Sequence, residues 1–416
     1  MKVEQLCIAA RDASRALATL PRARKDEALI AVAEALDRRA AEILTENRED
    51  VKLARENRLP DAMVDRLLLD EDRLKEVSAS VRALAAFPDP IGQIVDGWRL
   101  ENGLELRKVR VPLGVVAVVY EARPNVTVDA ACLCLKTGNA VILRGGSAAK
   151  HTNRILTEVV QGAVIEAGLP REVVAYLSPD DRRELTELIQ QRRYVDLVIP
   201  RGGEQLKDYL LEHSRVPVVY AAGGNCHVYV DAAADLGKAV QIIINAKCQR
   251  PGVCNAAETL LVHEAVAAAF LPRAVEELRR RGVELVVDEV TAGILDEPSL
   301  KRATETDYET EFLALKLAIR VVASIDEALD HIARYGTRHS EAIVSDDLVA
   351  ANRFTAEVDA GCVYVNASTR FTDGGQFGLG GEMGNSTQKL HVRGPIALDD
   401  LTCVKYVLWG DGQVRG

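Results

Sequence analysis

The chain has 416 residues, 48% of them hydrophobic and 27% charged, which is ordinary for a globular protein with a large core. The 52 basic residues against 62 acidic ones give a formal charge of −10, which argues against a general nucleic-acid binder but still allows a local basic pocket for a phosphorylated ligand. No apolar run approaches the roughly 18 residues of a membrane span, the first residues lack the apolar segment of a signal peptide, and the eight cysteines are spaced irregularly. We therefore expect a reduced, cytoplasmic protein without a nucleic-acid or membrane partner.

The first part of the chain, residues 4–87, is expected to be helical. Apolar residues recur there at helical spacing between charged ones, as in Ala28, Leu29, Val32 and Leu36. A different pattern begins near residue 96, where apolar residues alternate on both sides of the pair Asn102-Gly103. This pattern predicts a β-hairpin with an Asn-Gly turn.

Compact apolar runs then alternate with helical patterns, which is typical of a parallel α/β sheet. The expected strands are 115–120, 140–143, 173–177, 197–199 and 216–220. The expected helices between them include 149–167 and 181–191. The pattern restarts near residue 225 with strands at 228–230, 259–262, 283–287 and 318–322, and residues 402–408 resemble a lone strand. The fold class is therefore α/β, with two α/β domains.

The segment most suggestive of chemistry runs from Asn245 to Glu258 and contains two cysteines. Cys254 follows a glycine turn and precedes an apolar run, a position from which a thiolate could attack an electrophilic carbonyl. From the residues alone, Cys254 is better explained as a small buried hydrophobic residue. Cys248 is the rival nucleophile.

Two glycine loops follow expected strands and precede helical patterns. One contains Arg144, Gly145, Gly146 and Ser147, and the other contains Arg201, Gly202 and Gly203. Backbone N–H groups at such junctions suit phosphate groups, and a neighbouring arginine adds positive charge. Neither loop matches a known nucleotide-binding motif, so each is also explained as a plain turn, although the two together favour a nucleotide site.

Other candidates carry less information by themselves. Asn125, directly after an expected strand, could donate its amide to an oxyanion or could serve only the turn. Cys132 and Cys134 lack a second pair at metal-binding spacing, and the seven histidines form no metal motif. We expect no metal site.

Several long segments together resemble one family, the aldehyde dehydrogenase superfamily, and within it the γ-glutamyl phosphate reductase family. The resemblance covers essentially the whole chain and is most specific at residues 115–127, 249–256, 322–343, 364–373 and 386–395. It implies an aldehyde-dehydrogenase-like fold with a Rossmann-type parallel sheet and a small β flap for oligomerisation. It also implies reduction of L-glutamyl 5-phosphate, an acyl phosphate, to L-glutamate 5-semialdehyde with NADPH, through a thioacyl intermediate.

The resemblance assigns roles to individual residues. Cys254 falls on the catalytic cysteine and Asn125 on the oxyanion-holding asparagine. The residues implied to bind NADP(H) are Arg144, Gly145, Gly146, Ser147, Lys150, Gly202, Gly203 and Glu311. The residues implied to anchor the amino-acid end of the substrate are Ser368, Thr369 and Arg370.

One departure from the wider superfamily bears on the reaction. Ala221 stands where hydrolytic members carry the glutamate that activates water, so phosphate-linked reduction suits the chain better than hydrolysis. Two alternatives share these features: a coenzyme-A-acylating aldehyde dehydrogenase, and a non-catalytic scaffold subunit of the same fold.

The resemblance also implies a division of the chain. Residues 1–93 and 113–225 are expected to form the NADP(H)-binding domain, 226–387 the catalytic domain, and 94–112 with 388–416 the flap. An isolated hairpin and an isolated strand need a partner edge, so we expect a homodimer or homotetramer. An association with glutamate 5-kinase is compatible with the labile substrate, but the sequence does not establish it.

Overall fold

The protein is described by a computed structural model that places residues 2–121 and 123–415. The chain forms two compact units: the first comprises residues 1–220, 378–384 and 396–416, and the second comprises 221–377 and 385–395. Both are α/β structures with parallel sheets, which confirms the predicted fold class.

The first unit begins with five helices, as the spacing of apolar residues predicts. They are α1 (Val3–Leu17), α2 (Arg22–Arg38), α3 (Ala40–Glu56), α4 (Asp61–Leu67) and α5 (Glu71–Ala86). Buried ion pairs join this block to the rest of the unit, because Lys136 Nζ donates to Asp26 at 2.5 Å and the buried Lys25 pairs with Asp89.

The central sheet of the first unit has the strand order β5-β4-β3-β6, and all neighbouring strands are parallel. Its strands are β3 (Val115–Tyr120), β4 (Ala140–Arg144), β5 (Val174–Tyr176) and β6 (Leu197–Arg201). The helices that connect them are α6 (Asn125–Lys136), α7 (Lys150–Glu166), α8 (Arg182–Ile189) and α9 (Glu204–His213), with short 3-10 turns η1 (Ser147–Ala149) and η2 (Arg171–Val173). Every residue of β3 is buried, as expected for a strand covered on both faces.

The strand predicted at residues 216–220 is wrong. Only an isolated bridge joins Val218 to Val198, flanked by hydrogen bonds from Val198 N to Pro217 O (2.9 Å) and from Val219 N to Val198 O (3.0 Å). Pro217 has no N–H to donate, so the segment cannot extend into a regular strand.

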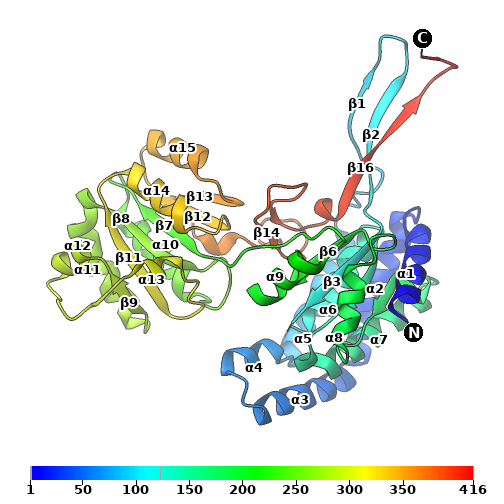
Figure 1. Ribbon diagram of the computed structural model, residues 1–416, viewed down its shortest axis with the longest axis horizontal. Coiled ribbons are helices and arrows are strands. Elements are labelled where there is room, and N and C mark those ends of the chain that lie inside the picture. The colour runs from blue at the N-terminus through cyan, green and yellow to red at the C-terminus, as the bar shows by residue number, and fades with distance from the viewer. Residues whose placement is uncertain (1, 122, 416) are drawn as a thin grey trace. The chain divides into compact units, whose positions relative to one another are not determined.

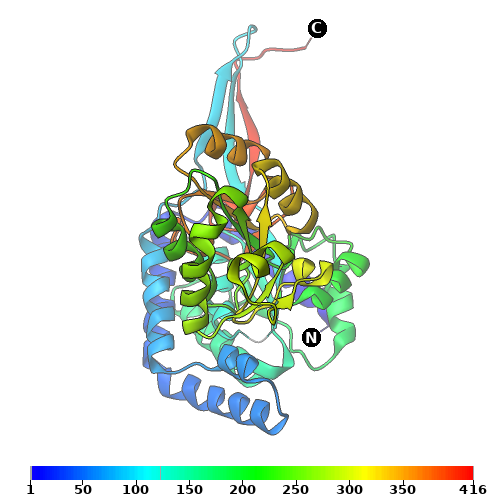
Figure 2. The ribbon, with the colours of Figure 1, turned by 90° about the vertical axis from the view of Figure 1, so that its left-hand side faces the viewer.

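A separate three-stranded antiparallel sheet, which we call the flap sheet, also belongs to the first unit. It has the order β1-β2-β16 and contains β1 (Ile94–Arg99), β2 (Glu105–Pro112) and β16 (Thr402–Trp409), the last preceded by the 3-10 turn η4 (Asp399–Leu401). Figures 1 and 2 both show the hairpin and the terminal strand side by side, projecting from the helices of their own unit. The predicted lone strand is therefore paired with the predicted hairpin. The hairpin turn contains the predicted Asn102-Gly103 pair within a three-residue loop, and Gly103 has a φ of +88°.

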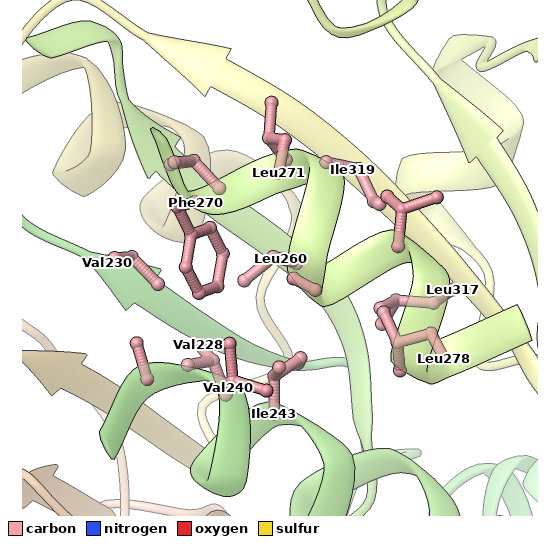
Figure 3. Close-up of a cluster of buried hydrophobic side chains, with 14 of the residues drawn as sticks. Val228, Val230, Val240, Ile243, Leu260, Phe270, Leu271, Leu278, Leu317 and Ile319 are labelled. Carbon is pink, nitrogen blue, oxygen red and sulfur yellow. The ribbon is translucent and has the colours of Figure 1, made fainter. Parts of the chain in front are cut away.

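The second unit is built on a seven-stranded parallel sheet of order β10-β9-β11-β8-β7-β12-β13. The strands are β7 (Cys226–Val230), β8 (Ala257–His263), β9 (Glu284–Val287), β10 (Lys301–Arg302), β11 (Lys316–Val322), β12 (Ser340–Val344) and β13 (Cys362–Val365). The helices are α10 (Leu236–Cys248), α11 (Glu264–Arg280), α12 (Glu289–Leu295), α13 (Glu305–Glu309), α14 (Ile325–Tyr335) and α15 (Leu348–Glu357), followed by the 3-10 turn η3 (Thr369–Phe371) and the short pair β14 (Asn385–Ser386) and β15 (Gly394–Pro395). Figure 3 shows the core of this unit, in which Phe270 and Leu271 of α11 and Val240 and Ile243 of α10 pack with apolar side chains of the sheet.

Candidate active site

The predicted site residues of the first unit gather at the carboxyl edge of its central sheet. Asn125 follows β3, the Arg144–Lys150 segment follows β4, and Gly202 and Gly203 follow β6. Because β4, β3 and β6 are parallel neighbours, these three segments leave the sheet at the same edge, which is where ligands bind in open α/β sheets.

Asn125 is the first residue of α6, and Asp129 holds its side chain. The Asn125 amide Nδ2 donates to Asp129 Oδ2 at 2.9 Å. The start of the helix is fixed by Thr127, whose hydroxyl lies 2.6 Å from the Tyr120 hydroxyl and 3.1 Å from Asn153 Oδ1. The amide is thus presented from a position tied to both β3 and α7.

Arg144 ends β4 and is almost completely enclosed, with a relative exposure of 9%. Its Nε atom is buried and has no hydrogen-bond partner among the residues described. Burial lowers the pKa of this guanidinium, which is the expected effect of taking a cation out of water. A buried cationic group with an unsatisfied donor is costly, so the position suits a negatively charged ligand.

The loop after Arg144 is closely packed against α7. A Cβ atom at Gly145 would lie 2.1 Å from Asn153 Nδ2, so no larger residue fits without a shift. Asp50 of α3 anchors the first turn of α7, because its carboxylate accepts from Thr152 N at 2.7 Å and from the Thr152 hydroxyl at 2.6 Å. Nothing in the local sequence marks Asp50, since it lies about 100 residues before the loop that it holds.

Two other predicted cofactor residues are engaged by acids, and a third is an acid that accepts a backbone hydrogen bond. Lys150 forms a salt bridge with Asp180, and the N–H of Gly203 donates to Glu121 Oε2 at 3.1 Å. In the second unit, Glu311 Oε1 accepts from the N–H of Gly224 at 2.7 Å. Ser147 is exposed.

Cys254 lies in the second unit, on the loop between α10 and β8, and it is exposed. Cys248, the rival candidate, is half-buried at the end of α10, and burial raises the pKa of its thiol. The backbone of Gly224 passes directly against the nucleophile loop, since a Cβ atom there would lie 1.6 Å from the Cys254 carbonyl oxygen. The same carbonyl accepts from the Cys226 thiol at 3.2 Å, so the backbone of the loop is held while the Cys254 side chain faces solvent.

The predicted substrate anchors surround the residue that follows the nucleophile. Arg370 Nε donates to Gln249 Oε1 at 2.9 Å, and its guanidinium also hydrogen-bonds the Asn255 side chain. Thr369 is fully buried and donates to the Asn255 carbonyl at 2.7 Å, while Ser368 accepts from Arg370 N at 3.2 Å. Burial lowers the pKa of Arg370, and a negative charge at Cys254 counteracts that shift. The charges of Arg370 and of a thiolate at Cys254 would therefore attract each other.

A buried ion pair that sequence reasoning missed supports the same region. Lys247 of α10 pairs with Glu258 of β8, both with fully buried side chains. Glu258 Oε1 also accepts from Leu313 N at 3.2 Å, where Leu313 has a positive φ of 52°. Burial raises the pKa of Glu258 to about 7, although the charge of Lys247 opposes this shift. The sequence signal for this pair is that Lys247 and Glu258 are charged residues inside otherwise apolar segments.

Two kinds of feature, a metal-ligand cluster and a membrane-spanning helix, are absent from the part of the chain that the structure describes. Within residues 2–121 and 123–415, no three metal-ligating side chains come together in a suitable cluster. No helix in this part of the chain combines the length and apolar character needed to cross a membrane.

Comparison with known proteins places the chain in a family. The model of the aldehyde dehydrogenase family matches residues 1–303. The gamma-glutamyl phosphate reductase of Moorella thermoacetica is 53% identical over 406 residues, which is 98% of this chain and 97% of that protein. The reductase of the same name from Thermobifida fusca is 51% identical over 413 residues, or 99% of this chain and 98% of that protein.

Structural comparison agrees with the sequence comparison. The crystal structure of the gamma-glutamyl phosphate reductase of Thermotoga maritima matches with a TM-score of 0.96 and 46% identity, covering 100% of both chains. The chain therefore belongs to the aldehyde dehydrogenase family of oxidoreductases and, within it, to the gamma-glutamyl phosphate reductases.

Proposed function

We propose that the chain reduces L-glutamyl 5-phosphate to L-glutamate 5-semialdehyde and phosphate with NADPH, the second step of proline biosynthesis from glutamate. The observation that carries the proposal is the exposed Cys254 thiol, in a chain that is 53% identical to a named reductase over nearly its full length. We assign this reaction to the cytoplasm.

Cys254 is the proposed nucleophile. Its thiolate attacks the acyl carbon, a C–S bond forms, and the C–O bond to phosphate breaks as phosphate leaves with the electron pair. Asn125 donates its amide to the oxyanion that forms on the way; loss of one such donor typically costs about 10² to 10³ in rate. The thioacyl carbon then accepts a hydride, the C–S bond breaks, and the aldehyde leaves with the thiolate restored. Ser368, Thr369 and Arg370 anchor the amino-acid end of the substrate.

The family and the reductase names of its relatives imply a nicotinamide cofactor, and we propose that it is NADPH. When bound, NADPH supplies the hydride. The enclosed Arg144, with its unpartnered Nε, fits a phosphate group, and Lys150 and Ser147 lie close by in the same segment. The loop of Gly145 and Gly146 and that of Gly202 and Gly203 would present backbone N–H groups to the pyrophosphate; the N–H of Gly203 would exchange its hydrogen bond to Glu121 for one to the ligand. Glu311 would hold the nicotinamide ribose.

The two units take different parts in this proposal. The first unit, without the flap sheet, binds NADP(H), and the second carries the nucleophile. The flap sheet joins copies of the chain into a homodimer or homotetramer. An association with glutamate 5-kinase would shield the labile acyl phosphate from hydrolysis.

The proposal is tested by the reverse reaction, in which the semialdehyde reduces NADP⁺ and phosphate accepts the acyl group. We expect Cys254→Ser to abolish phosphate-dependent turnover and the matched Cys248→Ser to retain it. If Cys254→Ser keeps near wild-type activity, Cys254 is not the nucleophile.

Substitution of co-reactants separates the alternatives. A coenzyme-A-acylating enzyme would turn over with coenzyme A in place of phosphate, and a scaffold subunit would not turn over at all. Because Ala221 offers no base to activate water, we expect little free glutamate when phosphate is omitted, and robust phosphate-independent turnover would contradict the proposal.

A further inference from the structure

Asp129 is the residue whose side chain contacts Asn125, the proposed oxyanion donor. We propose that Asp129 is a positioning residue that orients the amide of Asn125 so that an N–H, and not the carbonyl oxygen, faces the reacting acyl group. This inference rests on the proposed function, in which Asn125 stabilises the oxyanion.

The geometry supports orientation by a single hydrogen bond. Asp129 lies one helical turn after Asn125 on α6, so the two side chains share one face of the helix. Asn125 Nδ2 donates to Asp129 Oδ2 at 2.9 Å. An amide nitrogen carries two hydrogens, so this bond leaves the second one available to a ligand.

The chemistry of a carboxylate makes this contact directional. The two ends of an asparagine amide have nearly the same shape, and without a partner either end can face the substrate. An ionised carboxylate only accepts hydrogen bonds, so it draws the NH₂ end toward itself and turns the carbonyl oxygen away. With the amide reversed, a carbonyl oxygen would meet the oxyanion, and two acceptors would repel.

Asp129 has no other evident purpose in the structure. Asn125 is its only hydrogen-bond partner among the residues described, and helix α6 is otherwise packed mainly with apolar side chains. Burial raises the pKa of Asp129 to about 6, whereas the hydrogen bond from Asn125 and the charge of Arg201 lower it. The group is thus ionised at neutral pH, in the form that only accepts.

A double-mutant cycle tests the inference with four proteins: wild type, Asn125→Ala, Asp129→Asn and the double variant. Asparagine at position 129 keeps the size of the side chain but can donate as well as accept, so it removes the directional preference. We expect Asp129→Asn to lower kcat about tenfold, with KM for both substrates within about twofold, and Asn125→Ala to lower kcat by about 10² or more. The double variant should equal Asn125→Ala, since no amide is left to orient.

The outcomes separate this inference from the proposed function. If Asp129→Asn slows the Asn125→Ala enzyme by the same factor as the wild type, Asp129 acts independently of Asn125 and the inference is overturned, while the proposed function stands. If Asn125→Ala leaves kcat unchanged, the assigned oxyanion donor is wrong and the inference falls with it.

Two further variants guard against a merely structural effect. Asp330→Asn removes an exposed acid on α14 and should leave kcat unchanged. If Asp129→Asn fails to fold, Asp129→Ser provides a smaller group that also both donates and accepts, and the same non-additivity is expected. Full additivity with this variant overturns the inference equally.

Discussion

At the scale of single residues, Arg370 offers a means of activating the proposed nucleophile. Its guanidinium is held by Gln249 and Asn255, and a negative charge at Cys254 favours its charged form. We expect Arg370→Gln to slow alkylation of Cys254 by iodoacetamide at pH 7 by about threefold or more, because a nearby cation favours the reactive thiolate. Arg370→Lys, which keeps the charge, should recover most of the rate.

The half-buried Arg353 provides a matched control, since its partners are Asp326 of α14 and Glu357 of α15. Arg353→Gln should leave alkylation unchanged. An Arg370→Gln enzyme with unaltered alkylation but a raised KM for the acyl substrate would instead identify Arg370 purely as a substrate anchor.

The residues that the sequence could and could not reveal differ in one physical respect. The neighbours of Cys254 and Asn125 suggest chemistry but also allow a purely structural role. The resemblance of several long segments to one family is what assigns these two residues their predicted roles. Asp129, Asp50 and Glu258 are ordinary acids in sequence. Asp129 lies only four residues after Asn125, but the sequence does not show that the two side chains hydrogen-bond. Asp50 holds a residue about 100 positions later, and the burial of the Lys247–Glu258 pair likewise appears only in the folded chain. Residue type is local information, whereas burial and hydrogen bonding are not.

At the scale of elements, hydrophobic periodicity predicts most of the helices and central strands, because each must bury one face or both. It fails where another rule applies. Residues 216–220 are apolar enough for a strand, but Pro217 interrupts the hydrogen-bond ladder. The strand near residue 402 is correctly located, but its partner, β2, lies about 290 residues earlier, and local periodicity carries no information about such pairing.

Helix α14 carries a prediction about pH. His331 lies buried between Tyr308 and Tyr335, with its Nδ1 atom 3.2 Å from an Arg320 nitrogen. Burial lowers the pKa of His331 from 6.5 to about 2. Below pH 6.5 His331 is therefore protonated in the unfolded chain but stays neutral in the folded chain. This difference lowers the free energy of unfolding as the pH falls below 6.5.

We expect acidification from pH 7.5 to 5.5 to cost the wild type about 1.4 kcal/mol more of unfolding free energy than the His331→Gln variant, since one pKa unit corresponds to about 1.4 kcal/mol. Urea unfolding of both proteins at each pH measures the difference. Equal losses in the two proteins would show that His331 does not contribute in this pH range.

At the scale of the whole molecule, the flap sheet has open edges and exposed apolar side chains. It consists of three strands, and β1 and β16 each have one neighbour. Its exposed apolar residues are Ile94, Val95, Trp98, Val404, Tyr406, Leu408 and Trp409. Exposed apolar side chains on open strands are a known cause of association between chains, so a second copy is the partner that our proposed homo-oligomer requires.

We predict that Leu408→Asp combined with Trp409→Ser lowers the molar mass in sedimentation equilibrium from that of an oligomer toward the 45.3 kDa of one chain. A charge on a surface that must be desolvated opposes association, whereas the β16 backbone hydrogen bonds to β2 do not depend on these side chains. The matched control is Leu348→Asp with Val349→Ser on α15, two other exposed apolar residues, which should leave the mass unchanged. Because the core of each unit lies elsewhere, the flap variant should keep the circular dichroism of the wild type. An unchanged oligomer in the flap variant, or a monomeric wild type, would refute a role for this sheet in assembly.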